Sequence, residues 1–276
     1  MIDLGQVHPQ IYSLVTPIVR DLVNEVGIDP KRILIIGAAC RDILHSSLGH
    51  TFKTRATTDT DLAIAINDWA VFGRVKENFA QIGSNGIRYK IAGVPVDIVP
   101  FGDIEDPSGI SRPDSRREDL NVTGFSDVHT HSLPLQLPDG PEICLPTPAG
   151  YAALKMYSWL DRSAYGEYRD APDLALSVWW YEQASEVENR LYGEEYTVLE
   201  SYAWDLKLAA ARLLSMDVTT LLSRSNHENL TSRWSTQDAE TLASWFTLPP
   251  DGPSPRSIDE RRAIVEQLAP FATASS

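Results

Sequence analysis

The sequence has little cysteine, no long hydrophobic run and fewer basic than acidic residues. Two cysteines among 276 residues, Cys40 and Cys144, are too few for a disulfide framework and form no Cys-x-x-Cys pair, which fits a reducing compartment. The opening residues, MIDLGQVHPQ, lack the basic and apolar segments of a secretory signal. The longest nearly pure apolar stretch, Ile33–Cys40, is far shorter than a membrane span. We therefore expect a cytoplasmic protein without membrane association.

The charge balance is acidic. The chain carries 24 Lys and Arg against 38 Asp and Glu, a formal net charge of −14. This balance argues against broad, non-specific coating of nucleic acid, but it leaves room for a local basic cleft. Arg112, Arg116 and Arg117 are clustered in one such stretch. A hydrophobic fraction of 43% predicts a large buried core, and the length suits one or two domains.

The first half of the sequence alternates helix and strand patterns. Apolar residues at helical spacing run from residue 11 to residue 26, with Pro17 as an expected kink or restart. Short apolar runs predict strands over residues 31–36 and 57–66, each followed by a helical pattern. Gly93 separates two further apolar runs and predicts a tight hairpin.

A polar segment and a hairpin come before the second half of the chain, which is predominantly helical. Residues 102–130 are polar and rich in Asp, Arg, Ser and Pro, which predicts a loop, and a Pro-Asp-Gly turn then predicts another hairpin before residue 146. Thr147-Pro148 is a typical helix start, and Ser257-x-x-Glu260 is a capping box that predicts a last helix. The sequence thus predicts an α+β fold with a small mixed sheet and helices over residues 1–146, followed by a helical domain over residues 147–276.

A strand-to-helix turn is the first candidate for chemistry. The predicted strand ends at Gly37, and Ala38 and Arg41 follow in the next helix. The start of a helix offers free backbone N–H groups and a positive dipole end, both of which suit phosphate. Gly37 allows a ligand to approach the backbone closely, although most such junctions are only turns.

Three aspartates form the second candidate. Asp59 and Asp61 are two residues apart on a predicted strand, so their carboxylates leave the same face. Asp97 lies within an otherwise apolar strand, which is the kind of local conflict that is found at functional sites. The alternatives are a solvated strand end for the first pair and an edge position for Asp97 beside Pro95. Mg²⁺ is the natural partner of clustered carboxylates.

At these residues the chain resembles the DNA polymerase beta-like nucleotidyltransferases, and within them the AbiEii/AbiGii toxins of type IV toxin–antitoxin systems. The toxins' R-x-T-x-D-x-D-L motif is similar to Arg55-x-Thr57-x-Asp59-x-Asp61-Leu62. Their later helical lysine and K/R-D-x-x-D-L motif are similar to Lys155 and to residues 169–174, RDAPDL. The resemblance covers about residues 30–180.

The resemblance implies a set of roles. Asp59, Asp61 and Asp97 would hold two Mg²⁺ ions, and Asp97 would also take the proton of the attacking hydroxyl. Asp170 would be a further active-site acid. The residues expected to contact the nucleoside triphosphate (NTP) are Gly37, Ala38, Arg41, Arg55, Thr57 and Lys155. The expected reaction moves a nucleoside monophosphate from NTP to tRNA or another RNA, with a cognate antitoxin as a partner.

Other interpretations stay open. Within the same superfamily the acceptor could be a small antibiotic-type molecule or a protein side chain, which the acidic chain slightly favours. A non-catalytic nucleotide-binding scaffold is the third interpretation, suggested by Gly37-Ala38 where many relatives carry Gly-Gly or Gly-Ser. Lys155 could be a solvated helix residue, and Arg169 with Asp170 a surface pair. His129 and His131 are expected to be ordinary loop residues rather than metal ligands.

Overall fold

The chain forms two compact units in the computed structural model, which describes residues 3–55 and 60–270. One unit consists of residues up to 50 and residues 55–147, and the other consists of residues 51–54 and the chain from Pro148 onward. The fold is mixed α/β and 53% helical. In the described ranges, no helix combines the length and the apolar character that crossing a membrane requires.

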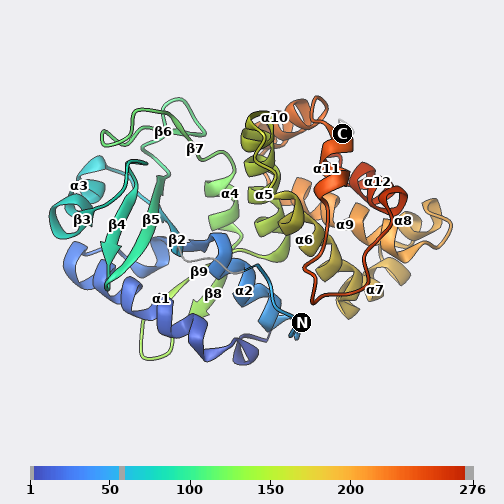
Figure 1. Ribbon diagram of the computed structural model, residues 1–276, viewed down its shortest axis with the longest axis horizontal. Helices are drawn as coiled ribbons and strands as arrows, with labels where there is room; N and C mark the ends of the chain where they lie inside the picture. The colour runs from blue at the N-terminus through green and yellow to red at the C-terminus, as the bar shows by residue number, and fades with distance from the viewer. Residues whose placement is uncertain (1–2, 56–59, 271–276) are drawn as a thin grey trace. The chain divides into compact units, whose positions relative to one another are not determined.

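A seven-stranded mixed sheet organises the first unit (Figure 1). The β1 strand is central and all four of its side chains are buried, because strands pair with it on both sides. It runs antiparallel to β2 and parallel to β9, while β2 runs parallel to β5. In sheet order the strands are β3 (Ala80–Gln81), β4 (Arg88–Ile91), β5 (Val94–Phe101), β2 (Thr60–Ala65), β1 (Ile33–Ile36), β9 (Glu142–Leu145) and β8 (Leu133–Gln136).

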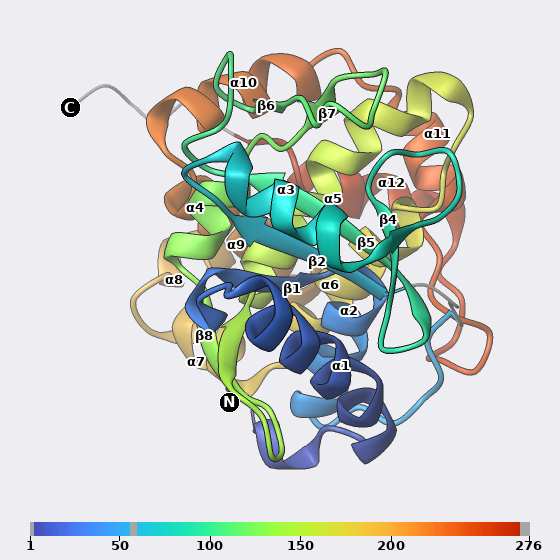
Figure 2. The ribbon, with the colours of Figure 1, turned by 90° about the vertical axis from the view of Figure 1, so that its left-hand side faces the viewer.

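Helices pack on this sheet, with α2 against β1 and β2 and with α1 against α2 (Figure 2). Of the kink or restart expected at Pro17, the restart is excluded, because α1 continues through Pro17 to Asp21 before the chain widens into a π-helical turn. The helices of this unit are α1 (Pro9–Asp21), α2 (Gly37–Ser47), α3 (Trp69–Asn78) and α4 (Phe125–Thr130), with short turns at Leu4–Gln6, Leu22–Val26 (η2) and Pro30–Arg32.

Both predicted hairpins are confirmed. Ala92 and Gly93 join β4 to β5, and both residues adopt the positive φ angles that a two-residue turn requires. The Pro-Asp-Gly turn joins β8 to β9. The expected loop over residues 102–130 is wrong in part, because it contains the β6–β7 pair (Ile110–Ser111 and Leu120–Asn121) and ends in α4.

The second unit is helical. Its core lies between α5, α6 and α9, where Trp159, Trp180 and Leu213 are fully buried. A capping box at Ser257 and Glu260 starts the last helix, as the sequence predicts. The helices are α5 (Pro148–Arg162), η4 (Ser163–Tyr165), α6 (Ala171–Gln183), α7 (Ser185–Tyr192), α8 (Tyr196–Ser201), α9 (Leu206–Leu221), α10 (Arg224–Trp234), α11 (Ala239–Trp245) and α12 (Ile258–Gln267).

Candidate functional site

One row of residues crosses four neighbouring strands of the sheet. Ile36 at the end of β1 pairs with Asp61 on β2, Asp61 pairs with Asp97 on β5, and Asp97 pairs with Arg88 on β4. Paired residues on adjacent strands project from the same face, and adjacent strands lie about 4.8 Å apart. The predicted neighbourhood of Asp61 and Asp97 is therefore confirmed. Asp59 and Thr57 lie outside the residues that the structure describes.

The Asp61 side chain occupies the space in which a side chain of residue 37 would lie. A Cβ atom built on Gly37 would lie 2.1 Å from Asp61 Oδ2 and 2.8 Å from its Cγ, distances that no real side chain could keep. Gly37 also has a φ of +63°, in the left-handed region that favours glycine. Both constraints require glycine at this position. The glycine in turn leaves room for the Asp61 carboxylate against the first residue of α2.

The start of α2 is suited to an anion. Its N-cap residue is Ile36, whose apolar side chain makes no capping hydrogen bond. The first turn of α2 also carries no acidic side chain. Gly37 and Ala38 are both partly exposed, as a backbone that meets a ligand must be.

Asp97 is held firmly by two neighbours that sequence reasoning missed. The Arg88 guanidinium donates from Nε to Oδ1 at 2.8 Å and from Nη2 to Oδ2 at 2.9 Å, and Asn85 Nδ2 donates to Oδ1 at 3.2 Å. This bidentate pair is the strong geometry for an arginine and a carboxylate. A carboxylate oxygen accepts about two hydrogen bonds. The contacts among the described residues therefore fill Oδ1 and leave one acceptor position on Oδ2.

The donor set fits a magnesium ion only with Asp61 as its main ligand. Mg²⁺ takes one or two protein carboxylates, the rest of its ligands being water and substrate phosphate. Asp61 and the remaining position of Asp97 Oδ2 meet that need. Over residues 3–55 and 60–270, the structure forms no group of three or more metal-ligating side chains. A third carboxylate could come only from Asp59, which those ranges leave out.

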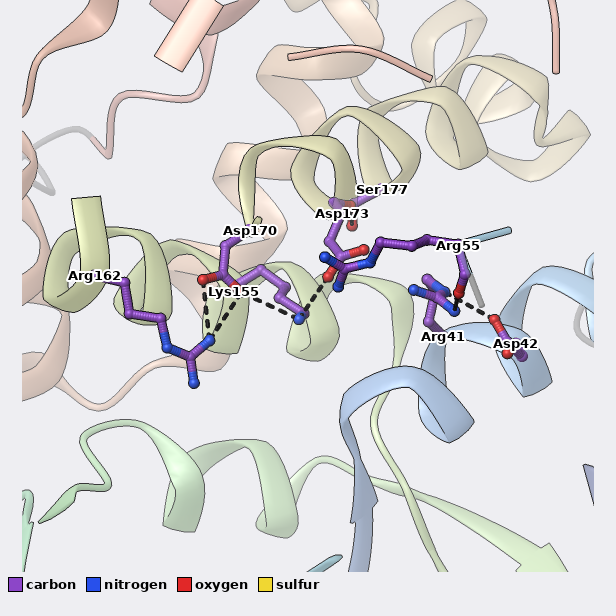
Figure 3. A network of polar contacts seen from close by, with 8 residues as sticks. All are labelled: Arg41, Asp42, Arg55, Lys155, Arg162, Asp170, Asp173 and Ser177. Carbon is purple, nitrogen blue, oxygen red and sulfur yellow. Dashed lines mark hydrogen bonds and ion pairs between the residues drawn. The ribbon is translucent and has the colours of Figure 1, made fainter. Parts of the chain in front are cut away.

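Arg41 is a buried residue of the same unit, and its guanidinium already has hydrogen-bond partners. Its side chain is 1% exposed, and its Nε donates to Asp42 Oδ1 at 2.8 Å (Figure 3). Its Nη2 donates to the backbone carbonyl of Arg55 at 2.6 Å. Arg41 therefore anchors the chain where it leads into the 55–62 motif, and this contact differs from the predicted contact with phosphate.

The second unit contains its own buried ion cluster (Figure 3). Lys155 Nζ lies 3.2 Å from Asp170 Oδ1 and 2.6 Å from Asp173 Oδ2, and Arg162 Nη1 lies 3.0 Å from Asp170 Oδ2. The Asp170 side chain is 1% exposed and the Lys155 side chain 13%. Lys155 is thus a largely buried, paired lysine rather than a solvated one, and Asp170 is buried rather than a surface residue.

The electrostatics of this cluster keep the lysine charged. Burial alone would lower the pKa of Lys155, but Asp173 and Asp170 outweigh it and raise this pKa above 10.5. A cation with a raised folded-state pKa stabilises the fold fully below the unfolded value, and this stabilisation is lost as the pH rises through the folded-state pKa.

His129 and Cys144 form a pair elsewhere in the first unit. His129 Nε2 lies 2.8 Å from the carbonyl oxygen of Lys31, and Cys144 Sγ lies 3.2 Å from the same oxygen. Burial opposes the Cys144 thiolate, but hydrogen bonds from His129 and Ser132 lower the pKa of this thiol below 9.0. His129 therefore contacts a thiol and a backbone carbonyl in a defined structure, where the sequence suggested only a loop residue.

No protein-family model matches this chain, and no curated protein sequence matches it.

Replacing Gly37 with alanine tests the contact with Asp61. The left-handed φ alone should cost about 1–2 kcal/mol in the free energy of unfolding, and the displaced Asp61 carboxylate should add to it. Gly27 is the matched control, because its φ is +71° and a Cβ there would meet nothing within 4 Å. Urea unfolding should show a larger loss for Gly37→Ala than for Gly27→Ala, and equal losses would contradict the contact.

Replacing Lys155 with methionine tests the buried cluster. Two buried carboxylates would lose their shared cation, which should cost about 3–5 kcal/mol in the free energy of unfolding. Arg162→Met is the control, because the Arg162 side chain is 40% exposed and its loss should cost about 1 kcal/mol or less. In urea unfolding, the gap between wild type and Lys155→Met should shrink only above pH 10.5. A gap that closes near neutral pH would contradict the assignment.

Cys144 should be the reactive thiol of the folded chain. Iodoacetamide should label Cys144 with a rate midpoint below pH 9.0, whereas the fully buried Cys40 should stay unlabelled until the protein unfolds. His129→Gln, which keeps a donor for the Lys31 carbonyl, should move the midpoint upward. Peptide mass spectrometry over a pH series distinguishes the two cysteines, and an unmoved midpoint in the variant would exclude His129 as the cause.

Proposed function

We propose that this protein is a Mg²⁺-dependent nucleotidyltransferase that moves a nucleoside monophosphate from NTP to an acceptor. The observation that carries the proposal is the Asp61 carboxylate against Gly37, beside Asp97 in the same row of the sheet. A backbone anion site and two hard oxygen donors thereby share one strand-to-helix turn. We also propose that the chain has the nucleotidyltransferase fold and that it is related to the AbiEii/AbiGii toxins.

The proposed chemistry divides between the two carboxylates. Asp61, with Asp59, would hold Mg²⁺, which when bound neutralises triphosphate charge and stabilises the attacking and leaving oxygens. The acceptor hydroxyl attacks the α-phosphorus while the bond to the β-phosphate oxygen breaks, and pyrophosphate leaves. The one remaining acceptor position of Asp97 Oδ2 would bind either a metal ion or the proton of the hydroxyl, but not both at once.

The other predicted residues enter the proposal in more specific roles. Gly37 and Ala38 would present backbone N–H groups to the phosphates, and Arg55 would add positive charge there. Arg41 would act as a positioning residue, because its side chain is committed to Asp42 and to the Arg55 carbonyl. Lys155 and Asp170 would act together, since neither side chain is available without the other.

We propose an RNA acceptor, tRNA in particular, with growth inhibition as the outcome and a cognate antitoxin as a partner. The support for RNA is the R-x-T-x-D-x-D-L resemblance alone. A small-molecule or protein acceptor uses the same two carboxylates, so the acceptor is decided by experiment. The filled Oδ1 of Asp97 favours the non-catalytic alternative enough to justify a test of binding as well as transfer.

The test is to incubate the full chain with each α-labelled NTP, Mg²⁺, and either total cellular RNA or aminoglycosides. Asp61→Asn should lower labelling by more than the roughly 10–100-fold typical of losing an outer-shell partner. Asp103→Asn is the matched control, because Asp103 is an exposed aspartate at the far end of β5. Urea unfolding of each variant verifies that the fold is intact.

Equal labelling by wild type and Asp61→Asn would overturn the catalytic assignment. Labelled RNA from wild type and Asp103→Asn alone would establish transfer to RNA, and labelled aminoglycoside alone would establish the small-molecule acceptor. Mg²⁺-dependent NTP binding without any transfer would establish the scaffold interpretation instead.

A further inference from the structure

A surface on α7, α8 and the following turn exposes three aromatic side chains. Tyr192 is 53% exposed, Tyr196 41% and Trp204 50%. The rings lie together: the Trp204 centroid is 5.3 Å from that of Tyr196, edge to face, and 6.3 Å from that of Tyr192. Exposed aromatics in contact with one another are typical of interaction sites rather than of ordinary surface.

The backbone supports the exposure of Trp204. Ala203 and Trp204 both have positive φ angles, of 50° and 69°, which residues other than glycine rarely adopt. Two such residues in succession turn the chain from α8 into α9. The turn thus holds the indole ring of Trp204 at the surface in a strained backbone conformation. Because this ring is half exposed, its burial does not repay the strain.

Each of these aromatic residues is close in sequence to an acidic residue. Glu188 is one turn before Tyr192 on α7, and Glu200 is one turn after Tyr196 on α8. Asp205 follows Trp204 directly, and its carboxylate accepts hydrogen bonds from the backbone N–H groups of Lys207 and Leu208 at the start of α9. All three acids are exposed. Between residues 186 and 205 the chain has six acidic residues and one basic residue, Arg190. The Arg190 guanidinium is paired with Asp217 at 2.8 Å and lies farther from Glu194 and Glu195, at 3.6 and 3.9 Å.

We propose that this aromatic–acidic surface binds an arginine-rich segment of another protein. A guanidinium stacks flat on an aromatic face and also pairs with a carboxylate in its plane, so alternating rings and acids match arginine better than lysine. The same negative charge repels RNA and anionic membranes. It also disfavours a second copy of this chain, whose net charge is −14. The proposal does not depend on the proposed catalytic function.

The test measures binding of a fluorescent peptide with six arginines by anisotropy, using the full chain. Matched peptides carry lysine or uncharged citrulline in place of arginine. The arginine peptide should bind most tightly, the lysine peptide more weakly and the citrulline peptide not at all. Trp204→Ala and Glu188→Gln/Glu200→Gln should each weaken binding about tenfold. Added salt should weaken it further.

Controls separate this surface from the general acidity of the chain. Tyr165→Ala removes an aromatic side chain that is 85% exposed, and Asp251→Asn/Glu228→Gln removes two exposed charges elsewhere in the same unit. Both control variants should bind like wild type. Equal affinity for the arginine and lysine peptides, or equal loss in the controls, would overturn the proposal. So would a dimer in sedimentation that Trp204→Ala abolishes, because the occupant would then be a second copy.

Discussion

The Asp61 carboxylate can occupy its position only because residue 37 has no side chain. That one steric constraint connects the end of β1, the start of α2 and the neighbouring strand β2. Ile36 pairs with Asp61 in the sheet, and the next residue, Gly37, makes the turn with a left-handed φ that lets the helix begin beneath the carboxylate. The glycine therefore serves the backbone and the site at once.

Charge in both units is compensated locally, although the chain as a whole is strongly acidic. Asp97 is bound by Arg88, and Asp170 and Asp173 share Lys155. Burial of an unpaired charge costs several kcal/mol, and each of these three carboxylates has a cation within its own unit. The excess negative charge is left to the surface, where it is solvated, and the stretch around Trp204 carries part of it.

The sequence predicted local features well, because hairpins and helix starts depend on a few adjacent residues. Gly93 and the Pro-Asp-Gly turn identified both hairpins, and Ser257 with Glu260 identified a capping box. Pro17 suggested a kink or a restart, and the chain does not restart there, because α1 continues through it. The α4 helix was hidden in a polar segment with only Val128 fully buried.

The site was only partly predictable for the same physical reason. The spacing of acids on strands placed Asp61 and Asp97 on one face, but the pairing of Arg88 with Asp97 depends on the register of β4 against β5. Arg88 reads in sequence as one polar residue in an alternating strand, and Asn85 as part of a turn. Lys155 likewise gave no sign of burial, because its two partners lie one helix further along the chain. Strand register and helix packing, rather than residue type, decide which charges meet.

The Arg88 pair also constrains what Asp97 can contribute to chemistry. A carboxylate held by two guanidinium nitrogens and an amide is fixed in orientation, and fixed orientation is what a positioned ligand or base needs. The same contacts fill Oδ1 and leave Oδ2 with a single position. In the proposed site, Asp97 therefore would not hold a metal and accept a proton through separate positions, and metal binding would depend mainly on Asp61. Its contact with Gly37 is consequently the feature on which the proposed activity most depends.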